Sequence, residues 1–262
     1  MSGHDQQITE SQVEINDRLI NYARVGNGDH NLLLFPGSLG TWETDFKLTL
    51  ETWNRTDFTI IAIDPPGHGK SRPPEREYVV GLNEKDAIFG NSLMEKLGLI
   101  PYSALGWSEG GRMAITTASM YPENVRKLVF WGTPCQIDKA YHDTFNGTRD
   151  VNAWPKERSA TFRKIYGRAN LQKIWNEHAD LCTTMWTEYG GHLCTHLLPD
   201  LPQPTLILSA EQDWLGGGLE QAVKLSKTIP NARLAIRRNS KHDIHIEHWQ
   251  WFNAAVEQFL LQ

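Results

Sequence analysis

Cysteine is scarce in this sequence, and its spacing argues against several kinds of protein. Three cysteines occur among 262 residues, at Cys135, Cys182 and Cys194, and none of them forms a Cys-x-x-Cys pair. Structural zinc sites use closely spaced pairs of ligands, so we expect no metal site. An odd number of dispersed cysteines also gives no disulfide framework, which favours a reducing compartment.

Long hydrophobic runs and an excess of basic residues are missing as well. No stretch of the sequence approaches the roughly 20 apolar residues that a membrane-spanning helix needs. The N-terminal stretch MSGHDQQITE has neither an apolar run nor an arginine, unlike a secretory signal or a mitochondrial presequence. The formal net charge is −5, whereas nucleic-acid and membrane-surface proteins usually carry a basic face. We therefore expect a cytoplasmic protein with no nucleic-acid or membrane partner.

Hydrophobic and charged residues occur in the proportions of a globular protein. They make up 40% and 22% of the chain, and 262 residues suit one α/β domain. The predicted strands are residues 12–17, 18–25, 31–35, 58–63, 103–106, 125–131, 204–208 and 233–237. The predicted helices are residues 83–97, 222–229 and 247–261, and a further helical stretch follows Gly111 and ends at Tyr121. This alternation predicts a mainly parallel sheet with helices on both faces.

One long segment interrupts the alternation. Residues 136–202 contain helical patches and several of the ten tryptophans, but no convincing buried strand. The segment is too long for a plain loop. We predict a helical cap at 136–202 over a core formed by residues 1–135 and 203–262, because open α/β sheets bind ligands at their carboxyl edge. The aromatic residues of this cap either line a substrate site or fill the cap's own core, and the second is our expectation for any single one.

The pentapeptide Gly106-Trp107-Ser108-Glu109-Gly110 lies between a predicted strand and a predicted helix. Such a G-x-S-x-G arrangement holds its serine in a tight, strained turn, where side chains at the glycine positions would collide with neighbouring elements. The turn lifts the hydroxyl above the sheet, and the following helix points its positive N-terminus at developing negative charge. We predict that Ser108 is a catalytic nucleophile.

Asp213 and His242 follow the last two predicted strands. A serine needs a base to take its proton, and that base is usually a histidine oriented by a carboxylate. In this architecture the acid follows the penultimate strand and the histidine follows the last one. We predict that Asp213 and His242 complete a triad with Ser108. Glu211 is a rival for the acid, although it follows its strand too closely to reach forward.

His245 and His248 continue a three-residue spacing from His242, which raises the alternative of a metal site. This spacing crosses a boundary between a loop and a predicted helix. No set of cysteines or carboxylates completes a tetrahedral shell around it. The catalytic interpretation of His242 is therefore preferred.

The loop after the predicted strand 31–35 supplies the remaining part of a catalytic site. A tetrahedral intermediate needs two backbone N–H donors, one from the residue after the nucleophile and one from this loop. We predict that Glu109 and Ser38 form this oxyanion hole, because the glycines of the loop let its backbone turn toward the serine. In the alternative, Pro36-Gly37 is only an ordinary turn that ends the strand. The catalytic function requires a turn at this position in either case.

Taken together, these motifs resemble the α/β-hydrolase family, and within it the valacyclovir hydrolase (biphenyl hydrolase-like) subfamily. The similarity extends over nearly the whole chain, through LLLFPGSLGTWETDF, DPPGHGKSRPP, LGWSEGG, YPENVRKLVFWG, TRDVNAW, HLLP and KHDIH. The resemblance implies an α/β-hydrolase fold and a serine hydrolase, without a cofactor, that acts on α-amino acid esters.

The resemblance also implies a role for the side chain after the nucleophile. In the subfamily an acidic residue there, usually aspartate, binds the α-amino group of the substrate, and this chain has Glu109. A carboxylate beside the nucleophile attracts an ammonium and repels an anion. In the alternative, Glu109 contributes only its backbone N–H to the oxyanion hole, and its side chain stabilises the N-terminus of the helix. We expect a small ester substrate with a free amino group and a monomeric protein.

Two other functions stay open. Carbon–carbon bond hydrolases and lactonases use the same triad, although Glu109 would repel anionic ring-cleavage products. A non-enzymatic ligand-binding protein on the hydrolase scaffold can also keep a triad. Epoxide hydrolases and haloalkane dehalogenases are disfavoured, because their nucleophile is an aspartate and position 108 is a serine.

Overall fold

An eight-stranded sheet forms the centre of the protein in the computed structural model, which describes residues 7–262. Its strands are β1 (Thr9–Ile15), β2 (Arg18–Val25), β3 (His30–Phe35), β4 (Phe58–Ile63), β5 (Tyr102–Trp107), β6 (Val125–Trp131), β7 (Thr205–Ala210) and β8 (Ala232–Arg237). Their order across the sheet is β1-β2-β4-β3-β5-β6-β7-β8. The β1–β2 and β2–β4 pairs are antiparallel, and the other pairs are parallel. The predicted mainly parallel sheet is confirmed.

The central strands are buried on both faces. Every residue of β4 and of β7 is buried. Because successive side chains of a strand point to opposite faces, complete burial requires a layer of helices on each side. One face packs against α2 (Leu82–Lys96), α3 (Glu109–Met120) and α7 (Gly218–Thr228). The other packs against α1 (Trp42–Thr52), α8 (Ile244–Glu247) and α9 (Trp249–Leu261).

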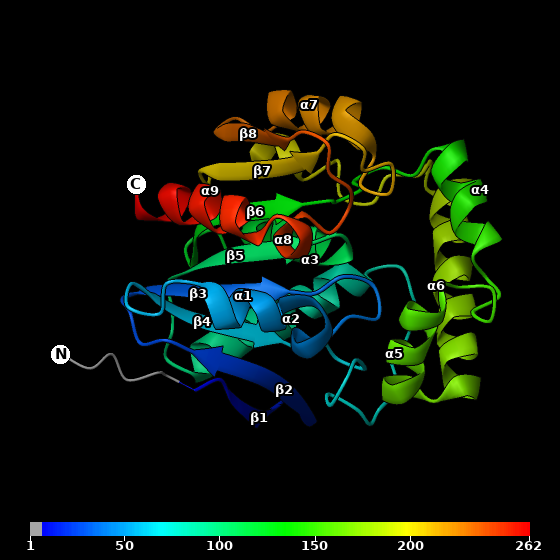
Figure 1. Ribbon diagram of the computed structural model, residues 1–262, viewed down its shortest axis with the longest axis horizontal. Helices are drawn as coiled ribbons and strands as arrows, with labels where there is room; N and C mark the ends of the chain where they lie inside the picture. Colours follow the sequence, from blue (N-terminus) through cyan, green and yellow to red (C-terminus); the bar gives the residue numbers. More distant parts are fainter. Residues whose placement is uncertain (1–6) are drawn as a thin grey trace.

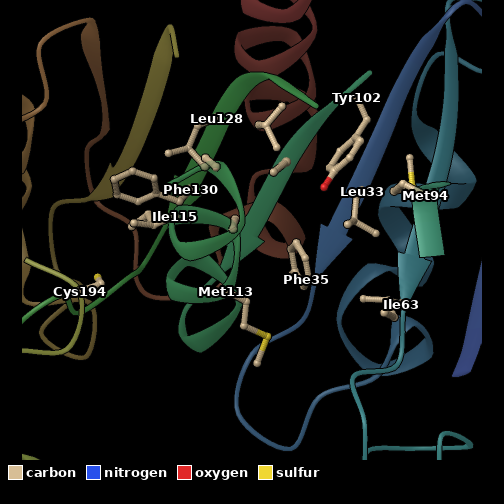
Figure 2. Close-up of a cluster of buried hydrophobic side chains, with 14 of the residues drawn as sticks. Leu33, Phe35, Ile63, Met94, Tyr102, Met113, Ile115, Leu128, Phe130 and Cys194 are labelled. Carbon is tan, nitrogen blue, oxygen red and sulfur yellow. The ribbon is translucent and has the colours of Figure 1, made fainter. Parts of the chain in front are cut away.

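Figure 2 shows the apolar cluster between the sheet and the helices α2 and α3. Met94 of α2 and Met113 and Ile115 of α3 share this cluster with Leu33 of β3 and Phe130 of β6. Each such side chain contributes about 1.5–3 kcal/mol when it is fully buried. The cluster therefore fixes α3 firmly against the strands, and with it the turn that joins β5 to α3.

Three helices separate β6 from β7 along the chain. They are α4 (Lys139–Gly147), α5 (Lys156–Tyr166) and α6 (Arg168–Glu188), and the short 3₁₀ helix η1 (Leu198–Asp200) follows them. They stand together beside the carboxyl ends of the parallel strands (Figure 1). The segment 136–202 is thus helical, and its division from the core as a cap stays a prediction.

The aromatic side chains of this helical segment serve two purposes. Trp154, Tyr166 and Trp175 are buried together in one cluster, where the rings of Trp154 and Trp175 meet edge to face at 4.8 Å. Phe162 is partly buried against the same cluster. Trp175 and Phe162 also line a cavity beside Ser108. The helices therefore have a small core of their own, and part of it faces the site.

Helix α1 is absent from the elements that the sequence predicts. Its sequence, WETDFKLTLET, has several threonines and no clear apolar stripe. A capping box starts it: the Thr41 hydroxyl accepts from the Thr44 N–H at 3.1 Å, and the Thr41 N–H donates to the Thr44 hydroxyl at 2.9 Å. Caps of this kind contribute about 1 kcal/mol. The box is the signal by which the helix could be recognised.

Among residues 7–262, no helix is both long enough and apolar enough to cross a membrane. Residues 1–6, which belong to the N-terminal stretch on which the expected cytoplasmic location depends, lie outside the described part of the chain.

Candidate active site

Ser108 lies at a sharp turn between β5 and α3. Its backbone has φ 56° and ψ −119°, a conformation that residues with a side chain rarely adopt and that marks a strained turn. A Cβ atom at Gly106 would overlap the carbonyl oxygen of Gly110, and one at Gly110 would overlap that of Phe35. The turn therefore needs both glycines, in agreement with the collision expected from the G-x-S-x-G spacing.

Asp213 and His242 meet beyond the ends of β7 and β8. His242 Nδ1 lies 2.9 Å from Asp213 Oδ1, and the backbone N–H of Gly216 donates to the same oxygen at 2.8 Å. An ionised carboxylate can only accept hydrogen bonds, so Nδ1 carries the proton and Nε2 is left as a base. The side chain of Asp213 is 4% exposed and that of His242 is 16% exposed. The acid is thus buried behind a histidine that still reaches the cavity.

Gly132 and Trp107 hold His242 in place, and neither was predicted to have a role in the site. Gly132 follows β6 with φ 59°, and a Cβ atom there would lie 3.0 Å from Cε1 of His242. Trp107 donates from Nε1 to the carbonyl oxygen of His242 at 3.2 Å, and the two rings are 5.1 Å apart between centroids. Trp107 is the residue before Ser108, so the same pentapeptide carries the predicted nucleophile and a support for the predicted base.

Glu211 was the alternative for the acid, and His245 was a candidate metal ligand. Both make other contacts. Glu211 is exposed and accepts from the backbone N–H of Asn239 at 2.9 Å. His245 is fully buried: the indole N–H of Trp131 donates to its Nδ1 at 3.1 Å, and its Nε2 donates to the carbonyl of Asp45 at 3.0 Å. Burial lowers the pKa of His245 to about 3, so the ring is neutral. In the described part of the chain, no group of three His, Cys, Asp or Glu side chains could hold a metal ion.

The loop after β3 faces Ser108. Ser38 lines the same cavity as Ser108. The backbone N–H of Gly37 donates to Asp45 Oδ2 at 2.8 Å, which fixes the loop from behind. Between residues 7 and 262, the backbone N–H groups of Ser38 and Glu109 donate to no other residue. Both donors are therefore available to an oxyanion.

Asp45 connects this loop to the buried His245. Burial raises the pKa of the Asp45 carboxyl to about 7, although the hydroxyl of Thr44 and the N–H of Gly37 both donate to it. Its backbone carbonyl accepts the Nε2 proton of His245. A chain of hydrogen bonds thus runs from the end of β6 through His245 and Asp45 to the loop beside Ser108.

Asp45→Asn is expected to flatten the pH dependence of stability. In the unfolded chain this carboxyl ionises near its ordinary pKa of about 3.9. The folded protein holds the proton up to about pH 7. Between these values the folded state binds more protons, so the free energy of unfolding falls as pH rises, by about 1.4 kcal/mol per unit for this group. Asparagine cannot titrate, so this contribution disappears.

Urea unfolding between about pH 5 and pH 7 measures the slope for the wild type and for Asp45→Asn. Burial also raises the pKa of Asp64, to about 6, but Asp64 titrates in both proteins. The difference between the two slopes therefore reports Asp45 together with its interaction with Asp64 and Asp243, and identical slopes would contradict a raised pKa at this position.

A cavity of about 340 Å³ opens in front of Ser108 and His242. Aromatic and aliphatic side chains form much of its wall: Trp107, Tyr141, Phe145, Phe162, Trp175, Leu215 and Ile246. Three ionisable side chains also face it, Asp45, Arg158 and Asp243. We call this space the catalytic cavity. Its lining comes from segments far apart in the sequence, so no local pattern identifies it.

Glu109 lines a second cavity of about 270 Å³, which we call the side cavity. The two cavities share the side chains of Tyr141 and Phe145, whose rings stack at 5.7 Å. Glu109 Oε1 accepts from Arg112 at 3.2 Å and lies 3.5 Å from Nε2 of His178. Ser108 thus lines one cavity and Glu109 lines the other, and the two cavities adjoin at Tyr141 and Phe145.

The carboxylate of Glu109 is only partly satisfied. Glu109 is 3% exposed, and its Oε2 has no hydrogen-bond partner among the residues that the structure describes. Burial alone would raise its pKa, but the electrostatic attraction of His178, Arg112 and Arg76 holds the pKa of this carboxyl well below its usual range. Glu109 is therefore ionised, and one of its oxygens is free to accept.

The comparisons with known proteins agree with this fold. A sequence model described as alpha/beta hydrolase fold matches residues 31–184. The chain belongs to the α/β-hydrolase family, and it is a hydrolase.

A relative in mouse, serine hydrolase BPHL, is 36% identical over 253 residues, which cover 97% of this chain and 87% of that protein. A Pseudomonas sp. protein named 2-hydroxy-6-oxononadienedioate/2-hydroxy-6-oxononatrienedioate hydrolase is 26% identical, covering 99% of this chain and 97% of its own. The solved structure of 2-hydroxy-6-oxo-6-phenylhexa-2,4-dienoate hydrolase from Rhodococcus sp. strain RHA1 has a TM-score of 0.79 at 16% identity, over 98% of this chain and 100% of that one. At such low identity the last similarity concerns the fold alone.

Proposed function

We propose that the protein is a serine esterase that cleaves α-amino acid esters through an acyl-enzyme. Ser108 Oγ attacks the ester carbonyl while Nε2 of His242 takes its proton. Asp213 stabilises the imidazolium that forms, and the N–H groups of Ser38 and Glu109 bind the oxyanion. His242 then gives the proton to the leaving alcohol. Water attacks the acyl-enzyme by the same steps and releases the amino acid.

The proposal of an amine substrate rests on the carboxylate of Glu109. Its Oε2 is a buried, ionised acceptor without a partner among residues 7–262, in the wall of a cavity next to the nucleophile. A buried acceptor left unpaired is costly, and an ammonium ion would satisfy it with a charge-assisted hydrogen bond. Arg112 binds the other oxygen, so it leaves this acceptor open.

Amino-acid benzyl esters and their N-acetylated forms test this proposal. We expect the wild type to prefer the free amine by about 30- to 100-fold in kcat/KM, because a desolvated charged hydrogen bond contributes about 2–3 kcal/mol. In Glu109→Gln the preference is expected to fall to a few-fold. The ratio of the two substrates on one sample does not depend on the fraction of folded enzyme, so reduced stability cannot mimic the result.

Glu84→Gln is the matched control, because Glu84 is an exposed carboxylate in the lining of the same side cavity. We expect this variant to keep the wild-type preference. Equal rates on the free and the acetylated esters would exclude recognition of an ammonium. Carbon–carbon bond hydrolysis would then be the better proposal, which the similarity to the Pseudomonas sp. protein favours.

A further inference from the structure

A cationic side chain faces the catalytic cavity without an anionic partner. Arg158, on α5, lines this cavity together with Ser108 and His242. Its guanidinium lies over the ring of Trp154, 4.6 Å from the centroid, and 5.8 Å from that of Trp175. Within the described residues Arg158 forms no ion pair and no hydrogen bond, whereas Arg149 of the same helical segment pairs with Asp180 at 2.8 Å.

The aromatic contacts give this guanidinium a defined position. Arginine keeps its charge at every physiological pH, and stacking on an indole restricts a side chain that is otherwise flexible. The five N–H donors lie in one plane around the edge of the group, in the fork geometry that carboxylates match. No protein group among the described residues accepts a hydrogen bond from these donors, so they are available to a ligand in the cavity.

Two carboxyl groups share the cavity with Arg158, and neither forms an ion pair with it. Asp45 accepts from Gly37 and Thr44, and burial raises its pKa to about 7. Burial also raises the pKa of Asp243, and the carboxyl groups of Asp243 and Asp45 both attract the guanidinium electrostatically. Neither forms an ion pair or a hydrogen bond with Arg158 among the described residues, so the N–H donors of Arg158 stay free of both acids.

The linings of the two cavities indicate which end of the substrate meets Arg158. In the proposed function, Glu109 draws the amine, and hence the acyl part, toward the side cavity, which adjoins the catalytic cavity at Tyr141 and Phe145. The leaving alcohol then occupies the catalytic cavity, against Phe162, Trp175 and Arg158. Resting on that proposed function, we infer that Arg158 binds a carboxylate on the leaving alcohol, and that the preferred substrates are amino-acid esters of aromatic hydroxy acids.

Two esters of one amino acid, with 4-(hydroxymethyl)benzoate and with 4-(hydroxymethyl)benzamide, test this inference. They have nearly the same shape and differ in charge at the end that meets Arg158. We expect the wild type to prefer the carboxylate ester by about tenfold in kcat/KM, mainly through KM, as a partly solvated charged pair allows. The preference is expected to weaken with added salt.

Three variants assign the effect to one side chain. Arg158→Gln is expected to bring the ratio of the two esters to about one, and Arg158→Glu to reverse it, because a carboxylate repels the anionic ester. Lys164→Gln is the matched control: Lys164 is an exposed cation on the same helix and lines neither cavity. It is expected to keep the wild-type ratio.

The outcomes separate this inference from the proposed function. Hydrolysis of both esters at equal kcat/KM by the wild type overturns the role of Arg158 alone, and so does a preference that survives in Arg158→Gln. Failure of the wild type to hydrolyse either ester overturns the proposed function, and the role of Arg158 with it.

Discussion

Replacing Ser108 by alanine is expected to lower kcat/KM for ester hydrolysis by about 10⁴- to 10⁶-fold, because no covalent acyl-enzyme can form. The backbone of the turn is kept, so the substrate still binds with little change in KM. Initial rates on a p-nitrophenyl ester of an amino acid measure the loss, and a fluorophosphonate that labels the wild type should leave the variant unmodified.

Ser38→Ala is the matched control for this experiment. It also removes a hydroxyl from the catalytic cavity, but it keeps the backbone N–H assigned to the oxyanion. We expect it to retain activity within about threefold, since the donor in question belongs to the main chain. Activity of Ser108→Ala near the wild-type level would refute the nucleophile and, with it, the proposed mechanism.

Asp213→Asn is expected to lower kcat by about 10³- to 10⁴-fold while the protein stays folded. The amide has nearly the same shape as the carboxylate and can still accept from Gly216. It lacks the negative charge that stabilises the imidazolium of His242 when the proton leaves Ser108. Steady-state kinetics measure the fall in kcat, and the midpoint of urea unfolding checks the fold.

Glu211→Gln separates the two candidate acids. Glu211 is exposed and contacts the backbone of Asn239, so we expect its loss to change kcat by less than about twofold. If Glu211→Gln inactivates the enzyme and Asp213→Asn does not, the assignment of the acid is wrong.

The parts of the fold that could be predicted are those with a local signal. β4 is an uninterrupted apolar run because helices cover both of its faces, and its bounds agree with the prediction. Ser108 is recognised because its strained turn needs glycines at fixed positions. Asp213 and His242 are found because the order of strands fixes the edge of the sheet at which they emerge.

The parts that could not be predicted depend on contacts between distant segments. His245 is a buried link between Trp131 and Asp45, which no spacing in the sequence reveals. The pairing of Glu109 with Arg112 has a local signal, the three-residue spacing on a helix, but His178 completes it from another helix. The meeting of the two cavities at Tyr141 and Phe145 is a property of the packed chain.

The position of the helices α4 to α6 in the chain has a consequence for how this enzyme can change. Ser108 precedes them, Asp213 and His242 follow them, and no residue of the proposed triad lies within them. Tyr141 and Arg158, which face the substrate in our proposals, lie on these helices. Mutations between β6 and β7 can therefore alter which leaving alcohols are accepted while the proposed triad is inherited intact. Libraries aimed at new leaving groups should begin with this stretch of the gene.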